Sequence, residues 1–207
     1  MEQTNLYYAA WWRRFAALWI DALVLLPFSI LQIALGRLSP RLYAALLIPF
    51  GLFFTGYLIF CHGRWGMTVG KRALGIRVCT LEGKPISWRQ AFLRNAVDIV
   101  IMVLFWVAML PAYLRIPTDG YAELTTRARF DLVRTFWPAW YPLVMKVEQG
   151  WIWSEFIVIL FNKRRRALHD FIAGTIVVQK KPTRRQAMAV DPYSIDFSKE
   201  MKRLQKL

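Results

Sequence analysis

The sequence predicts an all-α membrane protein: a four-helix transmembrane bundle with a small two-stranded cytoplasmic β-ribbon. Three observations predict this fold class. Of the 207 residues, 57% are hydrophobic, and apolar runs of about 20 residues are long enough to cross a hydrocarbon core of roughly 30 Å as helices. Basic residues are concentrated in alternate loops between these runs. Two short segments on one side of the bundle have the alternating pattern of strands.

Three of the four predicted spans are plain in the sequence. Residues 15–36 carry a single charge, Asp21, and residues 42–61 carry none. The turn between these two runs is tight, so we expect antiparallel neighbouring helices. Residues 95–114 form the third span and are charged only at Asp98. No cleavable signal peptide is expected, because the first run is too long for the apolar region of one.

The fourth predicted span, residues 143–161, is less apolar than the others. Its uninterrupted part, residues 151–161, would be only about 16 Å long as a helix. Extending the helix back to residue 143 brings in Lys146 and Glu148, so we expect a span whose outer turn is polar. A re-entrant or interfacial segment is the alternative. Residues 113–150 are expected to be an outer loop, unusually long for a compact bundle.

The net charge of +15 follows the positive-inside pattern of membrane proteins. Of the 28 lysines and arginines, two directly precede the first span, seven lie at residues 64–94 and twelve follow residue 161. This alternation predicts four spans with both termini in the cytoplasm. It argues against a nucleic-acid partner, and it predicts that the basic loop and tail rest against anionic lipid headgroups.

The predicted cytoplasmic ribbon pairs two segments of matching length. Residues 76–80 and residues 175–179 both have the pattern of short strands. Between them, the segment Ser87–Gln90 has the spacing of a capping box, which predicts a helix that runs along the interface and bends into the third span at Arg94. The polar, basic segment at residues 181–207 is expected to be a loosely ordered cytoplasmic tail.

Charged residues in or near the predicted spans form a candidate functional cluster of Arg14, Asp21, Arg94, Asp98 and Glu155. A carboxylate at a membrane helix centre is unfavourable by about 3 kcal/mol or more, so it needs a partner, water or a proton. Arg14 and Asp21 share a helix face but lie about 10 Å apart along the axis, too far for direct contact. Arg94 and Asp98 have the i,i+4 spacing of a side-chain pair. We expect all three acids to meet in one cluster that holds a proton or a monovalent cation.

A purely structural interpretation of these charges remains open. Arg13 and Arg14 can reach lipid headgroups without any other role. Arg94 and Asp98 can form an ordinary interfacial ion pair, and Glu155 can face the outer water.

A second candidate site lies on the cytoplasmic side, at Arg72, His169 and Asp170. His169 and Asp170 could act as a base and its orienting acid. Adjacent helical residues point about 100° apart, however, which is poor geometry for a bond between them. A structural role is therefore the main expectation, with Asp170 accepting hydrogen bonds from Arg72 or from nearby backbone groups.

The sequence predicts no catalytic residue, no cofactor and no metal site. Cys61 and Cys79 are not arranged as Cys-x-x-Cys and are expected to be packing residues. His62 and His169 are the only two histidines, so a histidine metal site is not expected. The chain contains no Gly-x-Ser-x-Gly motif, phosphate loop or zinc motif, and we do not expect an enzyme.

Three segments in order resemble the RDD family of bacterial membrane proteins. They are Arg-Phe-Ala-Ala-Leu-Trp-Ile-Asp at residues 14–21, Gly-Met-Thr-Val-Gly-Lys-Arg-Ala-Leu-Gly-Ile-Arg-Val at residues 66–78, and Arg-Arg-Ala-Leu-His-Asp-Phe-Ile-Ala-Gly-Thr-Ile-Val-Val at residues 165–178. The resemblance implies a single membrane domain at residues 1–180 and a location in the bacterial inner membrane.

The family is named after one arginine and two aspartates. By motif match, the arginine is Arg14 and the first aspartate is Asp21. Asp170 is similar to the second, with Asp98 as another candidate. The resemblance implies a role in transport, since some members are linked to sodium–proton exchange.

Two main functions follow from this sequence. The leading hypothesis is a small multi-pass protein whose buried Arg/Asp sites support movement of an ion or small solute, and four helices are so few that a homodimer or larger assembly is expected. The alternative is a non-transporting membrane adaptor or assembly protein whose basic cytoplasmic face docks a partner. An enzyme acting on lipid at the interface is a third, weaker hypothesis.

Overall fold

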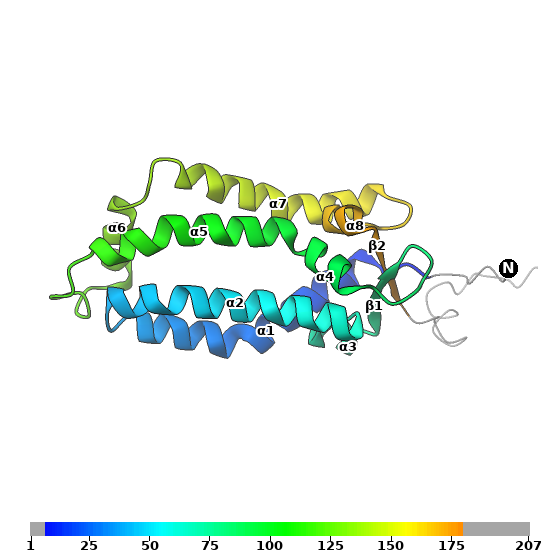
Figure 1. Ribbon diagram of the computed structural model, residues 1–207, viewed down its shortest axis with the longest axis horizontal. Coiled ribbons are helices and arrows are strands. Elements are labelled where there is room, and N and C mark those ends of the chain that lie inside the picture. The colour runs from blue at the N-terminus through cyan, green and yellow to red at the C-terminus, as the bar shows by residue number, and fades with distance from the viewer. Residues whose placement is uncertain (1–6, 180–207) are drawn as a thin grey trace, which may run out of the picture.

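Three long apolar helices dominate the structure (Figure 1). The computed structural model describes residues 7–179, so the predicted basic tail at residues 181–207 lies outside the described residues. Helices α1 and α2 each have 26 residues and α5 has 20, and all three are long and apolar enough to cross a membrane. Their bounds are Trp11–Gly36 for α1, Pro40–Trp65 for α2 and Ala96–Arg115 for α5.

A fourth long helix, α7 (Tyr141–Phe161), is continuous over 21 residues and lies beside α5 (Figure 1). With 21 residues it is close in length to α5 and shorter than α1 and α2, and it carries Lys146, Glu148 and Glu155. Because α7 is slightly longer than α5, its charged residues and not its length set it apart from the apolar helices.

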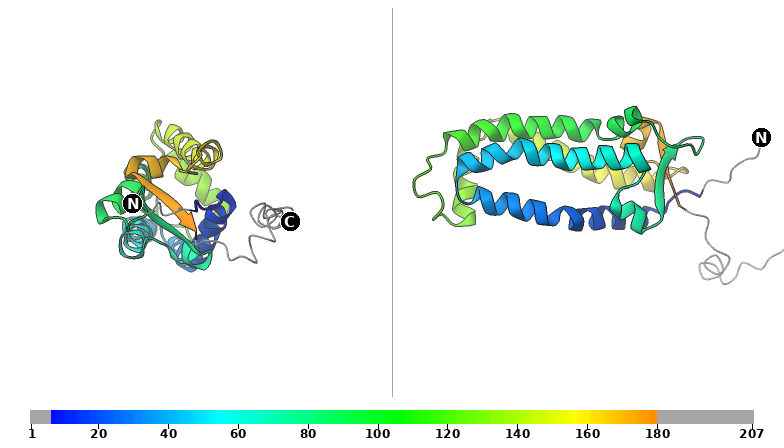
Figure 2. Two further views of the ribbon diagram at one scale, coloured as in Figure 1. Left: turned by 90° about the vertical axis from the view of Figure 1, so that its right-hand side faces the viewer. Right: turned by 60° about the horizontal axis from the view of Figure 1, so that its bottom comes forward.

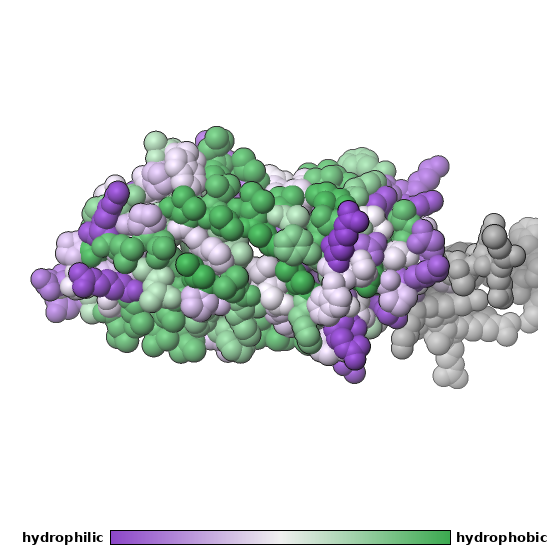
Figure 3. All heavy atoms as spheres, in the orientation of Figure 1, coloured by the Kyte–Doolittle hydropathy of each residue, from purple (hydrophilic) through white to green (hydrophobic). Residues whose placement is uncertain are grey.

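The four long helices pack side by side in the order α1, α2, α5, α7, and α7 also touches α1 (Figure 2). Close packing is possible where small residues face aromatic rings, because Gly36 lies against Tyr43 and Gly51 against Trp106. Most apolar side chains on these helices point outward, so the surface is apolar along the length of the bundle and polar toward its ends (Figure 3). Such a surface suits lipid and not water.

The predicted outer loop at residues 113–150 is more ordered than expected. It contains a further helix, α6 (Thr126–Thr135), whose first turn is capped by the Thr125 hydroxyl, which accepts a hydrogen bond from the Ala128 backbone at 3.2 Å. Buried Tyr121 and Val133 then pack this segment onto the ends of α2 and α5. The connection between α5 and α7 is long, as expected, but it contains a helix that was not predicted from the sequence, because α6 is polar and few apolar residues anchor it.

At the opposite end, the predicted ribbon is present and lies across the ends of the helices (Figure 2). Strand β1 (Ile76–Thr80) pairs antiparallel with β2 (Thr175–Gln179), so that Val78 lies opposite Val177. Tyr8 bridges to Val178 on the other edge of β2. The ribbon is thereby held between two neighbours and is not an isolated hairpin, which would be marginally stable.

Three short helices connect this ribbon to the bundle: α3 (Val69–Ala73), α4 (Trp88–Arg94) and α8 (Leu168–Ala173). The predicted capping box at the start of α4 is confirmed, since the Ser87 hydroxyl accepts from the Gln90 backbone at 3.2 Å and the Gln90 side chain accepts from the Ser87 backbone at 3.0 Å. Helix α4 ends at Arg94, and at Asn95 the chain bends into α5.

Helix α3 approaches α1 unusually closely at Gly70. A methyl group added there would lie 2.1 Å from the Ala17 carbonyl oxygen and 3.0 Å from the carboxyl carbon of Asp21. The absence of a side chain is therefore what allows α3 to rest on the backbone of α1.

We predict that Gly70→Ala lowers the free energy of unfolding by about 1–3 kcal/mol, because the methyl group would push α3 away from α1. Gly56→Ala is the matched control, since Gly56 also lies in a helix but has open space around its Cα. That change should be neutral or raise stability by up to about 1 kcal/mol through helix propensity. Thermal unfolding in detergent tests both variants, and equal stability of the two would contradict the close contact.

Candidate functional site

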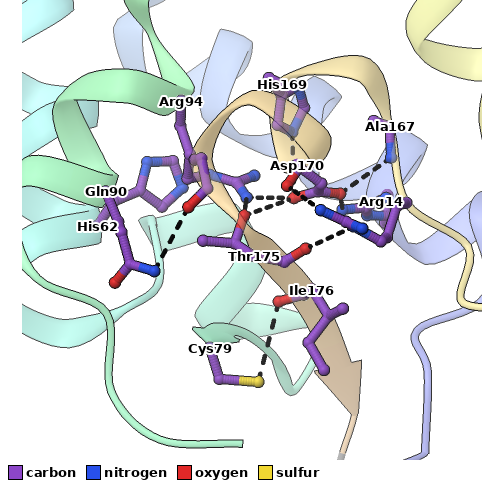
Figure 4. Close-up of polar contacts among 12 residues, drawn as sticks. Arg14, His62, Cys79, Gln90, Arg94, Ala167, His169, Asp170, Thr175 and Ile176 are labelled. Carbon is purple, nitrogen blue, oxygen red and sulfur yellow. Dashed lines mark hydrogen bonds and ion pairs between the residues drawn. The ribbon is translucent and has the colours of Figure 1, made fainter. Parts of the chain in front are cut away.

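Asp170 is the centre of a buried ionic cluster at the ribbon end of the bundle (Figure 4). Its carboxylate forms ion pairs with Arg14 and with Arg94. It also accepts hydrogen bonds from the Thr175 hydroxyl at 3.1 Å and from the Ala167 backbone at 3.0 Å. We refer to Arg14, Arg94, Asp170 and Thr175 as the Asp170 cluster.

The members of this cluster come from distant parts of the chain. Arg14 lies in the first turns of α1 and Arg94 is the last residue of α4. Asp170 lies in the first turn of α8, where its side chain also caps the helix. Gly174 ends α8 in the left-handed conformation at φ 64°, which turns the chain so that Thr175 starts β2 and accepts from Arg94 at 2.6 Å.

Two positive charges determine the ionisation of Asp170. Complete burial alone would raise the pKa of its carboxyl group, but the guanidinium groups of Arg94 and Arg14 outweigh this effect and hold the pKa well below its usual range. Asp170 is therefore a carboxylate at neutral pH, and the cluster carries one negative and two positive charges.

A third arginine holds the backbone around Asp170. Arg166 donates to the Thr175 carbonyl at 3.1 Å and to the Asp170 carbonyl at 2.8 Å, and its guanidinium carbon lies 4.0 Å from the centre of the Phe171 ring. Arg14 in turn donates to the Arg165 carbonyl at 2.8 Å. These contacts tie the loop after α7 to the start of α1.

His169 and Glu155 form a second ionisable pair beside the cluster. The Glu155 carboxylate contacts Nδ1 of the His169 ring and accepts from the His169 backbone at 3.1 Å. The other ring nitrogen, Nε2, lies 3.7 Å from an Asp170 carboxylate oxygen. Burial and the charge of Arg94 lower the pKa of His169, although Asp170 and Glu155 partly oppose this.

Asp21 is buried at a separate site on α1, where neutral donors surround it. It accepts from the Tyr57 hydroxyl at 2.8 Å, the Thr68 hydroxyl at 2.5 Å and the Gly70 backbone at 2.8 Å. Tyr57 also accepts from the Val69 backbone at 3.1 Å. The carboxylate thus joins α1, α2 and α3, and no ion pair to it occurs within residues 7–179.

Lys71 lies close to both sites. Its amine is 3.1 Å from Nε2 of His62. Burial, together with the positive charge of Arg94, lowers the pKa of Lys71 from its usual 10.5 to about 8, although Asp21 opposes this.

Asp98 and the two cysteines complete the ionisable groups of the predicted sites. Asp98 is exposed on α5, where it accepts from the Trp151 indole at 3.0 Å. Cys61 and Cys79 are buried and free, as expected of packing residues. Burial raises the pKa of the Cys79 thiol to about 11, which keeps it protonated.

The five residues of the predicted cluster do not meet in one place. Arg14 and Arg94 do converge, but on Asp170, while Asp21, Asp98 and Glu155 have three different sets of partners. As expected, Arg14 does not pair with Asp21. The functional role of these residues stays a prediction.

Two predicted pairings were wrong. Arg94 does not pair with Asp98, because the chain bends at Asn95 and the i,i+4 spacing of one continuous helix is lost. Asp170 does not bind Arg72, which is exposed on α3; the expected nearby backbone donor is present at Ala167, and the arginines of α1 and α4 supply the opposite charge.

Sequence reasoning missed several partners, above all Tyr57 and Thr68 for Asp21 and Thr175 for Asp170. Lone hydroxyl groups carry no spacing signal that links them to a distant acid. Thr68 and Thr175 lie inside the segments at residues 66–78 and 165–178 that resemble the family, and this was the available hint. Within residues 7–179, no three or more His, Cys, Asp or Glu side chains are grouped to hold a metal ion.

Long helices with outward apolar side chains and a polar end closed by buried ion pairs define a helical membrane protein. The chain belongs to the RDD family, whose family model matches residues 8–174. This confirms the resemblance seen in three short segments. No curated protein and no solved structure matches the chain.

We predict that Asp21→Asn lowers the free energy of unfolding by about 2–4 kcal/mol. An asparagine would turn an NH₂ group toward at least one of the three donors, which would leave buried polar groups unpaired. Asp98→Asn should change stability by less than about 1 kcal/mol, because Asp98 is exposed and has a single donor. Unfolding in detergent compares the two, and a fully stable Asp21→Asn variant would contradict a structural role for Asp21.

The depressed pKa of Lys71 predicts a specific pH dependence of stability. Between pH 8 and about 10.5 the unfolded chain binds the Lys71 proton more tightly than the folded chain, so stability should rise with pH in this window. The rise should disappear in Lys71→Met and persist in Lys84→Met, which removes an exposed lysine. Melting temperatures from pH 7 to 10.5 check this, and parallel curves for the wild type and Lys71→Met would refute it.

Proposed function

We propose that the protein supports movement of a proton or a monovalent cation in the inner membrane. In this proposal Asp98, Glu155 and His169, here called the acid–histidine line, carry the ion. The single observation that supports it most is the contact between Glu155 and His169. This pair joins a long helix to the Asp170 cluster, and neither Glu155 nor Asp98 has a lysine or arginine partner within residues 7–179.

The geometry gives His169 and Glu155 a chemical task each. Donation from Nδ1 to Glu155 leaves Nε2 of His169 free to accept a proton. Nε2 lies 3.7 Å from Asp170, whose negative charge would stabilise the imidazolium. The lowered pKa of His169 favours release of that proton at neutral pH. Glu155 lies on α7, which packs against α5, the helix that carries Asp98, so it is the next acceptor toward Asp98.

The Arg/Asp ion pairs have a different role in this proposal. Asp170 already binds two arginines, and its depressed pKa opposes protonation near neutral pH. Asp21 is buried and its carboxylate already accepts three hydrogen bonds. These residues hold the helices in place, and ion movement uses the acids that lack a fixed cation.

The proposed membrane arrangement has four spans, with α7 as the fourth and both termini in the cytoplasm. The basic residues after α7 and in the loop after α2 support this orientation. The exposed Asp98 on α5 supports a wet surface or a second copy of the chain at this face, because an acid facing lipid is strongly unfavourable. We therefore propose a homodimer or larger assembly.

A docking role is the second candidate function. The observation in its favour is the row of exposed basic side chains at the ribbon end. They are Arg64, Arg72, Arg77, Lys84 and Arg89. An acidic partner protein would suit this surface, and no ion movement would then be needed.

Ion flux in proteoliposomes tests the proposal. We expect Glu155→Gln and Asp98→Asn to reduce dye-reported proton or sodium flux at least about tenfold, because an amide cannot take up a proton. Asp131→Asn, which removes an exposed acid from α6 at the opposite end, should leave flux unchanged.

Normal flux in a folded Glu155→Gln variant would contradict the proposed path. A wild-type protein without flux, whose capture of an acidic partner is lost in Arg77→Gln and kept in Asp98→Asn, would favour docking instead.

A further inference from the structure

A cleft of about 430 Å³ lies at the ribbon end of the bundle, where α1 begins and α7 ends. One wall is the apolar last turn of α7, residues 159–161, and Trp11 of α1 also lines the cleft. Lys163 and Arg165 supply two positive charges. The cleft therefore combines an apolar wall with a cationic rim.

The loop that carries these two cations is held in a defined shape. The Asn162 side chain accepts from the Arg164 backbone at 2.8 Å, and the Asn162 carbonyl accepts from the Arg165 backbone at 2.8 Å. Arg165 has a φ of 49°, the left-handed region that is unfavourable for an arginine. Its carbonyl is bound by Arg14, so the Asp170 cluster fixes the position of the cationic rim.

The position of the cleft along the bundle axis also indicates what kind of ligand it can bind. It lies where the apolar surface of α7 gives way to the basic loop. In the proposed four-span arrangement, on which this inference rests, that level is the boundary between hydrocarbon and headgroups. Phe161 at this boundary is 86% exposed, more than any other large apolar side chain described. Tryptophan, like Trp11, is favoured at this depth because its ring is apolar and its N–H is polar.

We propose that the cleft is a specific binding site for an anionic phospholipid. The phosphate is held between Lys163 and Arg165, one acyl chain covers the apolar wall at Phe161, and Trp11 packs beside the glycerol region. A lipid with a net negative charge matches the two cations better than a zwitterionic one. A free phosphate would satisfy the rim but leave the apolar wall uncovered.

Lipid titration of the full chain in a neutral detergent tests the site, with native mass spectrometry to count bound molecules. We expect one tightly bound dioctanoyl phosphatidylglycerol, and dioctanoyl phosphatidylcholine at least about fivefold weaker. Lys163→Gln and Arg165→Asn should each weaken phosphatidylglycerol binding about fivefold. Asparagine is used at Arg165 because it tolerates the left-handed conformation.

Arg164→Gln is the matched control, because Arg164 lies between the two cations, is exposed and does not line the cleft. It should leave the affinity unchanged, and all three variants should keep the melting temperature of the wild type. An equal loss in Arg164→Gln would overturn the proposal, since the effect would then be general surface charge. Displacement of the lipid by millimolar inorganic phosphate would overturn it in favour of a phosphate site.

Discussion

The burial of Asp170 between Arg14 and Arg94 is the interaction on which the polar end of this protein depends. A carboxylate without solvent is stable only if its charge is balanced and its lone pairs are used. Asp170 meets both conditions with groups from α1, α4, α8 and β2. Since these elements are far apart in the sequence, this one residue fixes how the two ends of the domain meet.

The need to balance a buried carboxylate also divides the acids of this protein into two groups: those that hold the structure together and those that can take up or release a proton. Asp170 is balanced by two cations and Asp21 by three neutral donors, so both join helices at a protected site. Glu155 has a histidine partner and Asp98 an indole, neither of which carries a permanent charge. Groups of this second kind can change protonation without destroying the packing around them. Asp170 and Asp21 thus stabilise the fold, whereas Glu155 and Asp98 belong to the proposed ion path.

Much of the fold followed from local patterns. Apolar runs predicted α1, α2 and α5, alternation predicted both strands, and Ser87 with Gln90 predicted the start of α4, because each of these signals lies within a few neighbouring residues. The partners of the charged side chains were harder to predict from the sequence. The predicted Arg94–Asp98 pair assumed one continuous helix. No local sequence signal, such as a proline or a glycine, indicates the bend at Asn95. Arg14 and Asp170 are 156 positions apart in the sequence. Helix and strand spacing rules cannot predict a contact over such a separation.

Arg14, Arg94 and Asp170 act as one unit, and a comparison of unfolding free energies tests this directly. Asp170→Leu alone leaves two buried arginines without a counter-charge and should reduce stability by about 3–5 kcal/mol. Combining it with Arg14→Met and Arg94→Met removes all three charges and should restore most of that loss. If the three substitutions instead destabilise additively, so that the triple variant is the least stable, Arg14, Arg94 and Asp170 do not act as one unit.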